Sequence, residues 1–347
     1  MNKLILNISF RLIILSFLMV MIVSCGGNKS KKENKIGKDS VAVELSKLND
    51  EIEKSPNNAD LYDKRANYYI TKKEFELALS DVRQAMNIDS TKANYFLTLS
   101  DIYFAQGKAT ASQNALQKSI ALDPEFIEGY MKLAELNLYL KKYEKTFELI
   151  DKALELDKLN AKAYFMKGMT YKEMGDTAKA VKAFKTTIDQ DPEYYHAFIE
   201  LGLLYSLKHN KLALEYFNSA IRLNPKSVEA YYALGMFCQE NDKMNEALNA
   251  YTKIIQLEPK NKYAHYNMGY IHLVYLKVYD MAIKHFTNAI KCDPNYAEAF
   301  YNRGYSYELL GDIGNAREDY KEALRIKVNY QRAIEGMNRL DKLGAAH

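Results

Sequence analysis

The amino-acid sequence predicts an all-α solenoid built of stacked helix-turn-helix units. Three periodic features support this prediction: the spacing of proline, of small residues and of large apolar residues. The prolines are separated by 68, 68, 33, 34 and 35 residues, which is one or two multiples of about 34. Because proline cannot continue a helix, this spacing indicates a recurring helix boundary. The six prolines are Pro56, Pro124, Pro192, Pro225, Pro259 and Pro294.

Small residues occur at two fixed points of each 34-residue unit. The first set is Ala66, Ser100, Ala134, Gly168, Gly202, Gly235, Gly269 and Gly304. The second set is Ala78, Ser112, Thr146, Ala180, Ala213, Ala247, Ala282 and Ala316. Small residues at matched points of two antiparallel helices let their backbones approach closely. We therefore expect each unit to be a pair of packed helices.

Large apolar residues follow the same period and are expected to fill the space beside these close approaches. The fourth position of the units holds Tyr62, Phe96, Tyr130, Tyr164, Phe198, Tyr231, His265 and Phe300. The second helix offers Val82, Leu116, Ile150, Phe184, Phe217, Tyr251, Phe286 and Tyr320. The eight units are expected at residues 59–92, 93–126, 127–160, 161–194, 195–227, 228–261, 262–296 and 297–330. Residues 41–56 are expected to form a leading half-repeat or cap helix, and residues 331–347 a C-terminal capping helix and tail.

These units resemble tetratricopeptide repeats. The resemblance is carried by segments such as Ala230-Tyr231-Tyr232-Ala233-Leu234-Gly235 and covers residues 59–330, more strongly in units four to eight. It implies a right-handed superhelix with a concave groove lined by the first helix of each unit. The one-residue changes in unit length near His209 and Tyr279 are expected to fall in the turns between paired helices.

The resemblance also implies where a protein partner binds, because positions 5 and 9 of each unit usually face the groove. The candidate groove residues are Phe165, Met169, Leu203, Tyr232, Met236, Tyr266, Tyr270, Tyr301 and Tyr305. The alternative for the position-5 tyrosines, and for Asn267 and Asn302, is a role in the scaffold itself. In the first three units the matching positions include Asp63, Asp101 and Glu135, so we expect an acidic groove there.

The N-terminal residues predict a lipoprotein. Lys3 and Arg11 precede an apolar stretch that is too short to span a bilayer comfortably but suits a secretory signal. The run Ile22-Val23-Ser24-Cys25 resembles a bacterial lipobox, which implies a signal peptide over residues 1–24, lipidation at Cys25, and a membrane anchor, expected in the outer membrane with its face undetermined. Residues 25–40 are expected to be the lipidated cysteine and a flexible basic tether. The alternatives are an uncleaved signal anchor or an ordinary cleaved signal.

The sequence favours no cofactor, metal or catalytic site. His265 and His272 are seven residues apart, about 10.5 Å along a helix, which is too far to share a zinc ion. Cys238 and Cys292 are expected to be free thiols. No nucleophile stands in a recognisable catalytic context, no phosphate-binding glycine loop is evident, and the lysine excess lies in the first 40 residues rather than in a nucleic-acid-binding face.

The sequence therefore predicts a non-enzymatic, membrane-anchored scaffold that binds segments of partner proteins, in the assembly or secretion of cell-envelope components. No small-molecule substrate is expected. Two other functions remain open. One is a structural spacer that uses its convex face and ends, and the other is a docking regulator of an envelope enzyme.

Overall fold

The computed structural model describes the backbone of residues 33–344 and the side chains of residues 43–343, and within these limits every regular element is a helix. The chain divides into two compact bodies, one up to Ala163 and one from Tyr164 onward. The predicted signal peptide and Cys25 lie outside the described residues.

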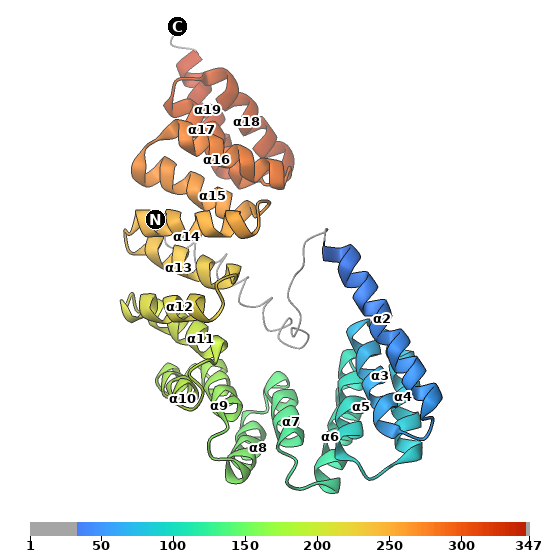
Figure 1. Ribbon diagram of the computed structural model, residues 1–347. Helices are drawn as coiled ribbons and strands as arrows, with labels where there is room; N and C mark the ends of the chain where they lie inside the picture. Colours follow the sequence, from blue (N-terminus) through green and yellow to red (C-terminus); the bar gives the residue numbers. More distant parts are fainter. Residues whose placement is uncertain (1–32, 345–347) are drawn as a thin grey trace. The chain divides into compact units, whose positions relative to one another are not determined.

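The first body consists of a leading helix and packed helix pairs (Figure 1). The leading helix α2 spans Glu33–Lys54 and packs against α3. The pairs are α3 (Ala59–Thr71) with α4 (Phe75–Ile88), α5 (Ala93–Ala105) with α6 (Ala109–Leu122), and α7 (Ile127–Tyr139) with α8 (Tyr143–Leu156).

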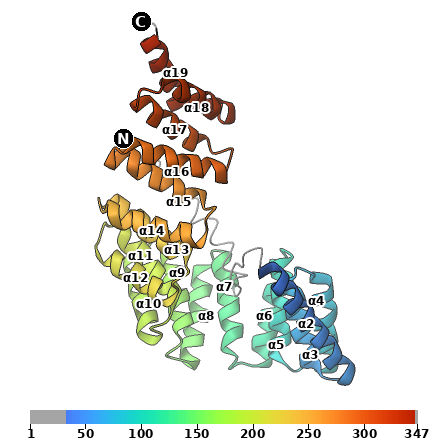
Figure 2. The same cartoon turned by 45° about the horizontal axis from the view of Figure 1, so that its top comes forward.

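The second body continues the same pattern and ends in a single helix (Figure 2). Helix α9 (Ala161–Glu173) begins just before the boundary between the bodies and is followed by α10 (Thr177–Gln190). The later pairs are α11 (Tyr195–Ser206) with α12 (Leu212–Leu223), α13 (Val228–Glu240) with α14 (Met244–Leu257), α15 (Lys262–Tyr270) and η1 (Ile271–Leu276) with α16 (Tyr279–Cys292), and α17 (Ala297–Leu309) with α18 (Ile313–Ile326). Helix α19 (Gln331–Gly344) packs on α18 and α17. The first helix of each pair starts at the residue where the sequence places the start of a unit.

The start of α2 differs from the sequence-based expectation. The sequence suggests a flexible tether to residue 40, but α2 begins at Glu33. Residues 33–40 contain no proline, and extending an existing helix costs much less than nucleating one. The last part of the predicted tether is therefore helical.

Each turn between paired helices contains one residue with a left-handed backbone. In the first pair this residue is Lys73, with φ of 61°, and the next amide, Glu74 N, donates to Tyr69 O at 2.9 Å. Such a bond closes the helix end and satisfies a carbonyl that has no partner within the helix. The eight left-handed residues are Lys73, Gly107, Lys141, Gly175, His209, Asp242, Lys277 and Gly311.

The turns between units explain the proline spacing. The residue before each of four prolines is Asp or Asn, and its side chain accepts a bond from the amide that follows the proline, as in Glu125 N to Asp123 Oδ1 at 3.0 Å. This is an Asx turn, which needs no proline. The same bond joins Leu159 N to Asp157 Oδ1 at 3.0 Å, where Lys158 replaces proline. Proline therefore favours this turn without being required for it.

Small residues on first helices face large buried rings on second helices, as the sequence predicts. A Cβ added at Gly235 would lie 2.8 Å from Cε1 of Tyr251, and one added at Gly168 would lie 2.6 Å from Cδ1 of Phe184. Both rings are fully buried. Glycine is favoured at these two points because the opposing ring lies so close that any Cβ would force it to shift.

The seventh unit accommodates its extra residue differently from the prediction. The sequence suggests that the insertion lies in the turn, but the end of the first helix widens into the π-helix η1. Val278 N donates to His272 O at 2.9 Å, whereas in the sixth unit Lys243 N donates to Cys238 O at 2.9 Å, one residue less. A π-helical turn absorbs a single residue without breaking the hydrogen-bond ladder. The missing residue near His209 does fall in a turn, between α11 and α12.

Two ion pairs with identical spacing brace the outermost full repeats, and sequence analysis did not find them. Arg303 binds Asp319 through two bonds of 2.7 Å, and Arg65 binds Asp81 through bonds of 2.7 and 2.8 Å. In each case an arginine on the first helix pairs with an aspartate sixteen residues later on the second. An arginine followed by an aspartate sixteen residues later is the sequence feature from which both ion pairs could have been predicted.

Candidate functional site

The predicted groove residues of the second body lie on the first helices of its pairs, but they are not equally exposed. Phe165 and Met236 are only 8% and 7% exposed, so both are mainly core residues. These two side chains therefore do not form part of an open stripe. Tyr194 lies 4.9 Å from Phe165 between ring centroids, and Asn267 Nδ2 lies 3.8 Å from Met236 Sδ. The other seven candidates are half-buried: Met169, Leu203, Tyr232, Tyr266, Tyr270, Tyr301 and Tyr305.

The position-5 tyrosines connect successive repeats. Asn302 Nδ2 donates to the Tyr266 hydroxyl at 2.9 Å, and Asn267 Nδ2 donates to the Tyr232 hydroxyl at 3.4 Å. Burial raises the pKa of the Tyr266 hydroxyl far above its usual range, so this group stays neutral. These contacts agree with the scaffold role that the sequence left open for the tyrosines and asparagines.

The position-9 tyrosines differ because no hydrogen bond joins their hydroxyls to another residue that the structure describes. Tyr270 stacks on Tyr266 with ring centroids 6.5 Å apart, and Tyr305 stacks on Tyr301 at 6.3 Å. Both rings also pack against the cluster around Leu273. Each ring is therefore held by packing while its hydroxyl has no hydrogen-bond partner within the described part of the chain, an arrangement suited to binding.

Two arginines of the capping helix lie near these tyrosines, and sequence analysis missed them. Arg339 lies over the Tyr305 ring at 5.5 Å and pairs with Glu308 at 2.7 Å. Burial raises the pKa of Tyr301, while Arg339 and Arg332 lower it. The sequence feature that could have identified them is their spacing of seven residues, which places both arginines on one side of α19, two turns apart.

The first body does not present the open acidic groove that its sequence predicts. Asp63 is buried and accepts a bond from Asn94 Nδ2 at 2.8 Å. Asp101 is neutralised by Lys132 at 2.9 Å. Burial raises the pKa of Glu135, which disfavours its charged form. The acidic side chains predicted to line the groove are therefore mostly buried or paired with a lysine.

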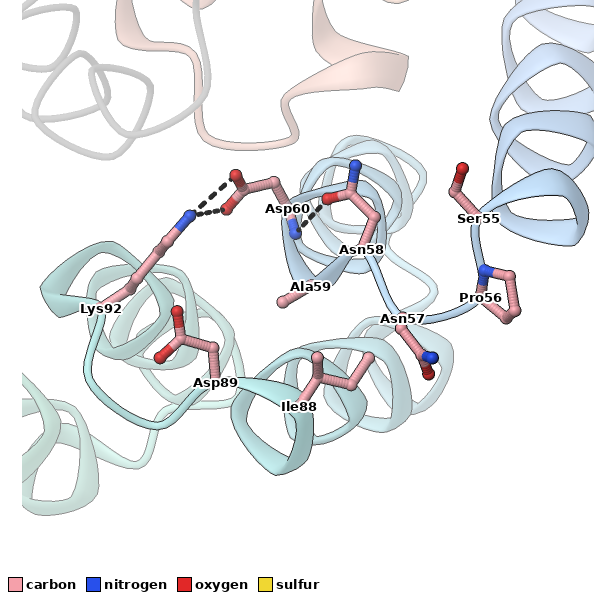
Figure 3. Close-up of a pocket in the computed structure, with 9 residues that line it drawn as sticks. All are labelled: Ser55, Pro56, Asn57, Asn58, Ala59, Asp60, Ile88, Asp89 and Lys92. Carbon is pink, nitrogen blue, oxygen red and sulfur yellow. Dashed lines mark hydrogen bonds and ion pairs between the residues drawn. The ribbon is translucent and has the colours of Figure 1, made fainter.

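A hollow of about 600 Å³ in the first body lies beside the loops that precede α3 and α5 (Figure 3). Its charged rim is already engaged, because Lys92 Nζ binds Asp60 at 2.7 and 2.8 Å. Asn58 accepts a bond from Asp60 N at 3.2 Å and thereby caps α3. The polar groups of this hollow are therefore already engaged in capping α3 and in the Lys92–Asp60 ion pair.

Three histidines cluster in the seventh repeat without forming a metal site. The His272 and His285 rings stack with centroids 5.2 Å apart, and His265 lies 6.3 Å from His285. Burial and the neighbouring histidines lower the pKa of His285 to about 4, so it is neutral at pH 7. Across the described part of the chain, no group of three or more His, Cys, Asp or Glu side chains is arranged to hold a metal ion. Cys238 and Cys292 are free thiols, the first buried and the second half-buried.

Family models match four separate regions of the chain. Models described as tetratricopeptide repeats match residues 93–126, 149–182, 216–249 and 297–330, and a model described as a TPR repeat matches residues 273–311. These regions are tetratricopeptide repeats. Two of the matches, 93–126 and 297–330, coincide with whole units of the helical pattern.

Similar proteins share parts of this repeat array. A UDP-N-acetylglucosamine–peptide N-acetylglucosaminyltransferase of Giardia intestinalis is 40% identical over 83 residues, which are 24% of this chain and 6% of that enzyme. Stress-induced-phosphoprotein 1 of Caenorhabditis elegans is 24% identical over 249 residues, 69% of this chain and 73% of that protein. The structure of Pseudomonas aeruginosa pilF matches 58% of this chain and 92% of its own with a TM-score of 0.51 at 16% identity, a similarity that shows the fold.

No helix within the described residues combines the length and apolar character needed to cross a bilayer. The lipid anchor predicted at Cys25 lies outside those residues and stays a prediction.

Proposed function

We propose that this protein is a scaffold that binds segments of partner proteins on a surface of its second body centred on Tyr270 and Tyr305, which we call the tyrosine surface. The observation that supports this proposal most directly is the state of Tyr270 and Tyr305. Their rings are held by packing, yet their hydroxyls contact no hydrogen-bonding partner among the described residues. Tyrosine contributes a large contact area and one polar group at a low cost in side-chain entropy, and it is enriched in interfaces.

Replacing Tyr270 and Tyr305 together by alanine should reduce the capture of partner proteins at least tenfold. Both rings also pack against Leu273 and its neighbours, so some stability will be lost with them, about 1 to 3 kcal/mol. Capture should be measured by crosslinking in the native envelope, at a temperature where circular dichroism shows the variant folded.

The matched control replaces Tyr216 and Tyr307 by alanine. Both are half-buried tyrosines of the second body that lie outside the groove positions, so this variant loses comparable packing but should keep its partners. Equal capture by all three proteins would instead favour a spacer that uses its convex face and ends.

We further propose that the chain is anchored in the cell envelope through a lipid on Cys25, with the repeats as its binding part. This proposal rests on the residues that precede Cys25 and on their resemblance to a lipobox. Labelled fatty acid should enter the wild-type protein and not Cys25→Ala. Equal labelling of the two proteins would rule out this anchor, while the binding proposal would stand.

A further inference from the structure

The turn of the seventh repeat exposes an unusual run of apolar side chains. Val274, Tyr275, Leu276 and Val278 are each 41% to 44% exposed and fall within five residues. Single exposed apolar residues are common on protein surfaces, but a contiguous group usually has a binding role. No other turn between paired helices in the described chain exposes more than two large apolar side chains. We call these four residues the seventh-repeat turn.

The inserted residue of this repeat enlarges the turn without disturbing the core. Ile271, His272 and Leu273 of η1 remain buried, while the residues after them emerge into solvent. Lys277 takes the left-handed conformation, with φ of 56°, that closes every turn. The insertion therefore adds surface at this turn, and π-helical insertions often occur at functional sites.

The apolar surface extends toward the eighth repeat. Leu309 and Leu310 occupy the positions of that repeat that match Val274 and Tyr275, and they are 41% and 47% exposed. Tyr305, one turn before Leu309 on α17, packs against the cluster that contains Leu273. The two turns consequently lie on the same edge of the stack.

The charges beside the seventh-repeat turn are mainly acidic. The pKa of Tyr275 is raised by burial, by Tyr270, and by two carboxylates of the sixth repeat, Asp242 in its turn and Glu240 at the end of α13. Tyr275 also contacts Tyr270 edge-on, with centroids 6.3 Å apart. Asp242 and Asp280 are exposed. Of the nearby lysines, Lys277 belongs to the turn, and Lys243 lies 4.0 Å from Glu246.

An apolar surface with acidic surroundings favours some partners over others. A second copy of the chain would bring the same carboxylates face to face, and an anionic lipid surface would be repelled by them. A segment with apolar side chains flanked by lysine or arginine satisfies both the apolar surface and the acidic surroundings.

We propose that the seventh-repeat turn, which adjoins the tyrosine surface where Tyr275 contacts Tyr270, is a docking site for a basic amphipathic segment of a partner protein. The apolar face of the segment covers Tyr275, Leu276 and Val278, and its basic residues meet Asp242 and Glu240.

The test uses two synthetic peptides and the full chain. One peptide carries leucine at positions i, i+3, i+4 and i+7 with lysine elsewhere, and the other has glutamate in place of each lysine. The lysine peptide should bind the wild-type protein at least tenfold more tightly than the glutamate peptide in fluorescence anisotropy. Leu276→Ser with Val278→Ser should weaken binding of the lysine peptide at least tenfold.

Two further variants separate apolar from charge effects. Asp242→Lys should weaken binding about threefold to tenfold and reduce its dependence on salt. Lysine already occupies the matching left-handed position at Lys73 and Lys141, so this backbone tolerates the change. Leu159→Ser with Val328→Ser removes two apolar side chains elsewhere that are more exposed, at 70% and 76%, and should leave binding unchanged.

Several outcomes would overturn the proposal. These are no binding of the lysine peptide, equal binding by the wild-type and Leu276→Ser/Val278→Ser proteins, or preference for the glutamate peptide. Self-association or binding to phosphatidylglycerol vesicles that the double serine variant alone abolishes would assign the surface to a second copy or to lipid. Met169→Ala with Leu203→Ala, on the predicted groove, should not affect the lysine peptide, so failure of either proposal leaves the other testable.

Discussion

Replacing Arg303 by leucine should lower the free energy of unfolding by about 3 to 5 kcal/mol. Its guanidinium donates two bonds of 2.7 Å to Asp319 and one of 3.1 Å to Thr287 Oγ1. The Asp319 side chain is only 7% exposed, so removal of the arginine leaves a buried carboxylate without its cation. The urea midpoint of the helical signal measures this loss, and hydrogen exchange should locate it in α17 and α18.

The same variant should be less destabilised at low pH. Burial already raises the pKa of Asp319, and Arg303 opposes that effect. Without Arg303 the folded-state pKa rises further, so the folded protein binds a proton more readily than the unfolded chain does. The penalty is therefore largest above the folded-state pKa and shrinks as the pH falls through it.

Two controls test this interpretation of the ion pair. Arg325→Leu breaks the exposed pair with Glu322 and should change stability by no more than about 0.5 kcal/mol. Arg303→Leu combined with Asp319→Leu should recover much of the loss, because no unpaired charge remains. A double variant as unstable as Arg303→Leu alone would show that the penalty comes from lost packing.

Gly235→Leu should cost about 3 kcal/mol through overpacking between α13 and α14. The new Cβ would lie 2.8 Å from Cε1 and 3.0 Å from Cζ of Tyr251. That ring cannot easily yield, because it is fully buried and its hydroxyl donates to Gln239 Oε1 at 3.2 Å. Thermal and urea unfolding should both show the loss.

Gly314→Leu is the matched control for that variant. Gly314 is an exposed helical residue, and an added Cβ would meet only Asp312 Oδ1 at 3.8 Å. Leucine has a higher helix propensity than glycine, so stability should stay the same or rise by about 0.5 kcal/mol. If Gly235→Leu proved as stable as this control, the close approach of α13 and α14 would be refuted.

Local structure could be predicted accurately from the sequence because the same local features recur from one repeat to the next. Gly235 facing Tyr251 is one example of a small residue opposite a large ring, and each such pair lies within one unit. Asp123 before Pro124 is likewise a local turn signal. Interactions within a single unit repeat at the period of the sequence, so aligning the units along the chain reveals them.

The candidate site was predicted less well, because position in a repeat does not determine exposure. Phe165 and Tyr305 lie at groove-facing positions of the same pattern, yet Phe165 is covered by Tyr194 and Tyr305 remains partly open. Arg339 reaches Tyr305 from the capping helix, outside the repeats. Such differences depend on which side chains neighbouring helices contribute.

The amino-acid sequence by itself determined the all-α repeat, its helix pairs and the two capping helices, since these follow from short-range periodicity and backbone chemistry. Only the tertiary structure decided which tyrosine hydroxyls form hydrogen bonds between repeats, that Asp101 is paired with Lys132, and that the insertion in the seventh repeat becomes a π-helix. The physical reason is that burial and pairing are properties of contacts between units, and the periodic pattern does not record which contacts form.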